Sequence, residues 1–166
     1  MDLAVRSLHL IAAAVWAGGL VFLGVAAGVA RATIPERERV EFFRRLGRRF
    51  LIVALAAALL LGLTGIDMAA DRLPSWDALT DTEWGRLILA KTILFAVALA
   101  LALVHSVVLG PRIRRLREAL LAAPHDAELE RRLRRVATAS GVAQGAILGL
   151  TLAILVLAAD LVSLRG

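Results

Sequence analysis

Long apolar runs alternate with short charged segments along this chain. Four runs are long enough for a helix to cross a membrane, at about residues 7–30, 50–70, 86–110 and 136–160. Crossing roughly 30 Å of hydrocarbon takes about 20 apolar residues in a helix. The pattern therefore predicts an all-α integral membrane protein in which residues 1–166 form one domain, an antiparallel bundle of four transmembrane helices.

The charged segments between the runs predict the direction of each crossing. Residues 31–49 carry seven arginines against three glutamates, and residues 112–135 carry eight arginines against four acids. Residues 67–86 carry five acids against two arginines. Because arginine-rich loops stay on the cytoplasmic side, we expect a multi-pass protein of the plasma (inner) membrane. Both basic loops would be cytoplasmic, and both termini and the acidic loop would lie outside.

Both basic loops continue the helical pattern. Apolar residues recur at helical spacing over residues 40–50, and two more such stripes flank Pro124. These stripes predict helical extensions into the cytoplasm. The segment Thr33-Ile34-Pro35-Glu36 predicts a capping box with proline at the first helical position. At the acidic loop, Thr80 or Asp81 is expected to cap the third transmembrane helix.

Composition supports the membrane assignment and narrows the chemistry. The chain is 60% hydrophobic, with a mean hydropathy of +0.78. It contains no cysteine, which excludes disulfides and thiolate metal sites. The net charge of +6 lies in loops beside the apolar runs, so it indicates contact with the lipid bilayer rather than with nucleic acid. Since no nucleophile triad, carboxylate pair or phosphate-binding loop is present, the sequence favours a role without catalysis.

Small residues recur every fourth position in three of the runs. Such rows let helix backbones approach closely, so they predict helix packing, within the bundle or between subunits. The glycines expected to pack helices are Gly18, Gly19, Gly24, Gly28, Gly62, Gly141, Gly145 and Gly149.

Several polar residues lie near the outer ends of the runs. Ionisable side chains within a membrane span are costly and usually mark function. Depth along the helices brings four such residues and one thioether to the outer leaflet: His9, Asp67, Lys91 and Asp160, with Met68. Lys91 and Asp160 are expected to give polar support, with the pairing of Lys91 left open among Asp67, Asp160 and a ligand. His105 lies about 21 Å farther along the third span than Lys91, at 1.5 Å per residue, and so belongs near the cytoplasmic face.

Two motifs carry a family resemblance. They are His9-x6-Trp16-x-Gly18-Gly19-x2-Phe22 and Trp84-Gly85-Arg86-x4-Lys91-x2-Leu94. With these motifs the chain resembles the CopD family of copper-resistance and copper-uptake membrane proteins. The resemblance implies copper handling from the outer side and carries over to His9, Trp16, Gly19, Gly85 and Lys91. His9 would be the outer copper ligand, assisted by Met68 or Asp67.

Two alternatives remain open. A histidine in the first helix and a lysine in the third are also similar to HemJ-type protoporphyrinogen oxidases, which are small four-helix membrane proteins. That weaker resemblance implies a membrane redox protein binding haem b or a porphyrin, with His9 as axial ligand, Lys91 on a propionate and Trp16 in the cofactor site. The other alternative is a non-catalytic small subunit of a larger membrane complex. A homodimer is compatible with the glycine rows.

Overall fold

The computed structural model describes residues 2–163, with side chains through residue 159. Its elements are α1 (Leu3–Thr33), α2 (Glu36–Ala70), α3 (Ala78–Asp81), α4 (Glu83–Val104), the π-helix η1 (His105–Leu109), α5 (Gly110–Ala122) and α6 (Ala127–Ser163). No strand occurs within residues 2–163. Four helices are long and apolar enough to cross a membrane, with α4, η1 and α5 counted as one. The predicted all-α membrane bundle is confirmed.

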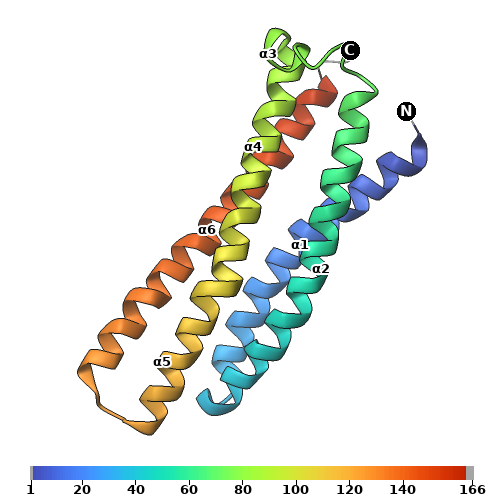
Figure 1. Cartoon of the computed structure of the whole chain (residues 1–166). Helices are drawn as coiled ribbons and strands as arrows, with labels where there is room; N and C mark the ends of the chain where they lie inside the picture. The colour runs from blue at the N-terminus through green and yellow to red at the C-terminus, as the bar shows by residue number, and fades with distance from the viewer. Residues whose placement is uncertain (1, 164–166) are drawn as a thin grey trace.

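The helices form two antiparallel pairs. α1 packs mainly against α2, and α4 packs mainly against α6, while contacts between the pairs are fewer. Figure 1 shows the α1–α2 corner and the α5–α6 loop at one end of the bundle. We call this the arginine-rich end. The segment from α2 through α3 to α4 lies at the opposite, acidic end, where α1 begins and α6 ends (Figure 1).

Two predicted helix starts are wrong in detail. α1 runs on through Thr33, whose hydroxyl donates to the Val29 carbonyl oxygen and therefore caps no later helix. Pro35 is then the residue before α2, which begins at Glu36 without a side-chain cap. At the acidic end the cap of α4 is Thr82, whose hydroxyl oxygen accepts from the Gly85 N–H.

The helices extend beyond the predicted spans at the arginine-rich end. α2 begins at Glu36, and α5 packs against the first turns of α6. Asp126 caps α6 by accepting from the backbone N–H groups of Glu128 and Leu129. Its carboxylate also suits the positive end of the helix dipole. The predicted helical extensions are therefore present as helices.

The densest packing surrounds one tryptophan. Trp16 of α1 is 5% exposed and packs against Ala57 and Ala58 of α2. Its indole also meets the Phe95 ring of α4 edge to face, with ring centroids 5.6 Å apart. Two small alanines on α2 make room for the indole. One aromatic side chain thus joins the two helix pairs.

The glycines differ in what surrounds them. A Cβ on Gly19 would lie 2.7 Å from Cζ of Phe50, so this glycine lets α1 approach α2. A Cβ on Gly85 would overlap the Ala78 carbonyl oxygen and lie 2.7 Å from the Leu79 Cα. A Cβ would meet no atom within 4 Å at the other predicted packing positions, namely Gly18, Gly24, Gly28, Gly62, Gly141, Gly145 and Gly149. Their packing role stays a prediction that would need a partner outside the chain.

The contrast between Gly85 and Gly18 is testable. Gly85→Ala should lower the free energy of unfolding by about 1–3 kcal/mol, because the new methyl group strikes the backbone of α3, which cannot rotate away. Gly18→Ala should change it little, since its Cβ meets open space. Detergent-solubilised protein followed by circular dichroism during denaturation gives the comparison. Equal stability of the two variants would contradict the close approach of α3 to α4.

Candidate functional site

His9 is held by a hydrogen bond between the first two helices. Its Nδ1 lies 2.7 Å from the hydroxyl oxygen of Thr64 on α2. Thr64 is 6% exposed, and its hydroxyl donates to the Leu60 carbonyl oxygen. A threonine hydroxyl has a single proton, so the oxygen must accept from His9 Nδ1–H. The proton therefore sits on Nδ1, and Nε2 keeps its lone pair.

Two small features of α2 shape the space around this imidazole. Gly65 presents no side chain toward it, and a Cβ there would lie 3.7 Å from His9 Cε1. The back-bond from Thr64 to the preceding turn is a common arrangement for threonine within a helix. The ring is thus fixed in orientation by α2 while belonging to α1.

Lys91 is the charged neighbour of His9. It lies on α4, is partly buried, and its ammonium group acts electrostatically on the His9 imidazole. Among the described side chains, Lys91 forms no ion pair with Asp67 or any other acid. His9 and Lys91 are therefore within electrostatic range of one another, and no acid among the described side chains pairs with the lysine.

The other predicted site residues lie at different positions around His9. Met68 is partly buried, one helical turn beyond Thr64 on the same face of α2. Asp67 is exposed at the end of that helix. The side chain of Asp160 lies outside the described residues. Within residues 2–159, no group of three or more histidine, cysteine, aspartate or glutamate side chains could hold a metal ion. A metal at His9 would therefore need other ligands beside the imidazole, such as the Met68 thioether, a single carboxylate or a group from outside the chain.

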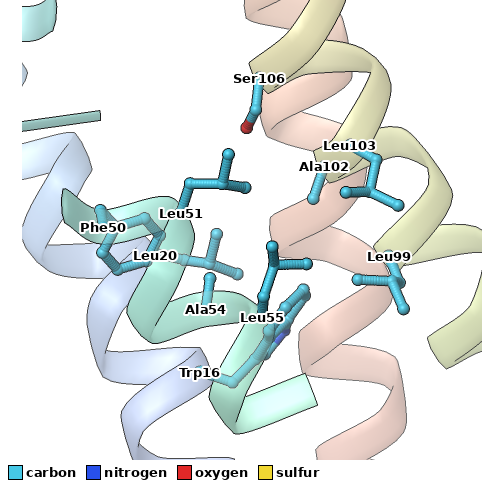
Figure 2. A pocket seen from close by; sticks show the side chains of 10 residues that line it. All are labelled: Trp16, Leu20, Phe50, Leu51, Ala54, Leu55, Leu99, Ala102, Leu103 and Ser106. Atoms are coloured by element: carbon cyan, nitrogen blue, oxygen red, sulfur yellow. The ribbon is translucent and has the colours of Figure 1, made fainter. Parts of the chain in front are cut away.

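Trp16 lies deeper in the bundle, on the same helix as His9. Its Nε1 donates to the Thr151 hydroxyl oxygen of α6 at 3.2 Å, and that hydroxyl donates to the Ile147 carbonyl oxygen. Figure 2 shows the indole at the edge of a cavity between the helix pairs, with the Ser106 hydroxyl at the other edge. The cavity measures about 40 Å³. That volume admits a few water molecules and no larger ligand.

A second polar cluster gathers at His105. Its Nε2 lies 2.9 Å from the Ser140 hydroxyl oxygen and 3.0 Å from the Gln144 amide nitrogen, both on α6. The amide nitrogen can only donate, so His105 Nε2 accepts. His105 is also the first residue of η1, and π-helical turns are frequent at functional sites. The sequence shows Ser140 and Gln144 one helical turn apart, which indicates a polar row on one face of a helix. Nothing in the sequence indicates that both residues meet His105.

Comparisons with known proteins identify one family. The family model described as copper resistance protein D matches residues 44–157. That range contains Thr64, Met68, Gly85 and Lys91, whereas His9 and Trp16 precede it. No curated protein and no solved structure matches the chain.

The link between Trp16 and Thr151 can be tested by removing its acceptor. Thr151→Val keeps the shape of the side chain but leaves the buried indole N–H unpaired, so the free energy of unfolding should fall by about 1 kcal/mol. Thr151→Ser keeps the hydroxyl group, so its free energy of unfolding should fall less. Denaturant titration in detergent distinguishes the two. A valine variant as stable as the serine variant would mean that the bond does not join the helix pairs.

Proposed function

The chain belongs to the copper resistance protein D family, and from this premise we propose that it handles copper ions at a membrane, with His9 as a ligand near the acidic end. The observation that carries the proposal is the hydrogen bond from His9 Nδ1 to Thr64. Metal-ligating histidines almost always donate their second ring N–H to a partner, which orients the ring and fixes the tautomer. His9 has such a partner in Thr64, which leaves its Nε2 lone pair for a metal ion.

The donor chemistry near His9 suits copper. Imidazole binds copper, and a thioether selects Cu(I) over harder ions. Met68 carries the thioether of α2, one turn beyond Thr64, and its side chain is long and flexible enough to reorient. Asp67 is a hard carboxylate at an exposed position, so we assign it an assisting role at the entrance. The ammonium group of Lys91 repels a metal cation at this site. The repulsion is smaller for a monovalent ion, and an anionic ligand bound with the ion would offset it.

The arginine content of the two ends supports an orientation. We place the arginine-rich end in the cytoplasm and the acidic end outside, because positive loops are retained inside. His9 then faces the outer side, where copper would arrive. An acidic surface there attracts cations before they reach the imidazole.

The haem alternative is less well supported. Ligand sites for molecules of drug size measure about 300–1,000 Å³, whereas the cavity beside Trp16 measures about 40 Å³. His9 and His105 bond to different partners on different helix pairs, so they do not face one another across a shared site. The subunit alternative draws support from the glycines whose Cβ positions face open space.

Copper binding can be tested with a graded set of variants. Purified protein should bind Cu(I) near stoichiometry, and His9→Ala should abolish that binding. Thr64→Val should weaken binding by about 10–100-fold, as loss of a group that orients a ligand does, while Thr64→Ser should bind nearly as the wild type. Competition with a chromophoric chelator measures each affinity.

His125→Ala is the matched control, because His125 lies in the α5–α6 loop at the other end. Unchanged copper binding in His9→Ala would overturn the assignment of the ligand. A visible Soret band that disappears in His9→Ala would favour the haem alternative instead.

The orientation can be tested by single cysteines, since the natural chain has none. Ser75→Cys, between α2 and α3, should react with a membrane-impermeant maleimide added to intact spheroplasts. His125→Cys should react only after the membrane is opened. The reverse pattern would place the His9 site on the cytoplasmic side.

A further inference from the structure

A groove lined by four arginines runs between α5 and α6 at the arginine-rich end. Its lining residues are Arg112, Arg115, Leu116, Arg132, Arg135 and Val136. The groove measures about 440 Å³ and lies well away from His9, where the two helices run side by side (Figure 1). The copper proposal leaves this groove without a role.

Charge in the groove is strongly unbalanced. Arg132 donates to Glu128, which it shares with Arg131. Among the described residues, Arg112, Arg115 and Arg135 have no ion pair within 4 Å. Counting the four arginines against Glu128 leaves a net charge of +3 (4 − 1). The four arginine side chains are exposed, so the guanidinium donors without an acidic partner are open to an anion from outside the chain.

Depth places the groove at the level of the lipid headgroups. Arg112 comes two residues after Gly110, where the third apolar run ends, and Arg135 immediately precedes the fourth run. The headgroup region adds about 5–7 Å on each side of the hydrocarbon. Arg115 and Arg132 are each three residues, about 4.5 Å, farther from the hydrocarbon. All four guanidinium groups can therefore reach phosphate groups of the bilayer.

The lining also contains two apolar residues. Leu116 follows Arg115 on one wall, and Val136 follows Arg135 on the other. A free anion gains nothing from apolar walls. The glycerol and the first methylene groups of a lipid, in contrast, pack against them. Basic pockets between transmembrane helices bind anionic headgroups in this way.

We propose that the α5–α6 groove binds the phosphate headgroup of an anionic phospholipid. Arginine forks hold phosphate oxygens through pairs of parallel N–H bonds, and the +3 charge of the groove suits a lipid with more than one phosphate. The bound lipid would clamp α5 to α6 at the membrane surface. This proposal does not depend on the copper assignment.

The test compares two variants that each remove two positive charges at the same end. Arg112→Gln/Arg135→Gln removes unpaired groove arginines, and Arg44→Gln/Arg45→Gln removes arginines that share Glu41 on α2. Each protein is placed in nanodiscs of phosphatidylcholine alone, or with phosphatidylglycerol or cardiolipin added. Native mass spectrometry then counts retained lipids, and titration with short-chain cardiolipin gives affinities.

The groove variant should bind cardiolipin about 30-fold more weakly than the wild type, because each surface arginine contributes about fivefold. The control variant should bind as the wild type does. Equal loss in both variants would reduce the effect to overall surface charge and overturn the proposal. So would full displacement of the lipid by millimolar inorganic phosphate, which would indicate a site for a soluble anion.

Folding is checked in the same samples. Circular dichroism and copper binding at His9 should be unchanged in the groove variant, so the two proposals can fail separately. Should the double variant fail to fold, the single variants Arg112→Gln and Arg135→Gln replace it, each with an expected loss of about fivefold. Unaltered cardiolipin affinity in both single variants would also overturn the proposal.

Discussion

The hydrocarbon interior of a membrane offers no hydrogen-bond partner, so each polar group placed there must find one in the protein. Three contacts between helices meet this constraint for the two histidines and the buried tryptophan of the bundle. His9 bonds Thr64 across α1 and α2, and His105 bonds Ser140 across η1 and α6. Trp16 bonds Thr151 and thereby joins the two helix pairs. In each of these three contacts a small hydroxyl residue on a neighbouring helix is the partner, and the Gln144 amide also meets His105. These contacts help to set which helix faces meet.

The need for a hydrogen-bond partner also fixes the orientation of the His9 imidazole. Because Thr64 gives its only proton to the Leu60 carbonyl oxygen, it can only accept from the imidazole. The tautomer of His9 is therefore set, through Thr64, by the Leu60 carbonyl group one turn before Thr64 on α2. What remains is a fixed ring with an Nε2 lone pair near the acidic end, bonded to α2 one turn before Met68. The orientation of this lone histidine in an apolar helix is set by its neighbour Thr64, as the proposed role of a ligand would require.

Much of the fold follows from the sequence, because span length and apolar content are local properties. The exact ends of the helices were harder to predict. Thr33 has the right spacing for a capping box, but its hydroxyl satisfies the preceding turn and α1 continues. The position of His9 near the start of α1 could be predicted, whereas its bond to Thr64 could not, since a threonine in an apolar run gives no sign of its partner. Trp16 and Thr151 are 135 residues apart, so only packing brings them together. Gly85 was singled out by a motif, and its physical reason, the approach of α3, appears only in three dimensions.

We propose above all that His9, oriented by Thr64, is a copper ligand. Copper K-edge X-ray absorption on Cu(I)-loaded protein tests it most directly, because the imidazole ring gives a characteristic outer-shell scattering pattern. The account predicts that this imidazole pattern is present in the wild type and in His125→Ala and absent in His9→Ala. An imidazole pattern that persists in His9→Ala, or a wild-type spectrum with no nitrogen scatterer, would contradict it.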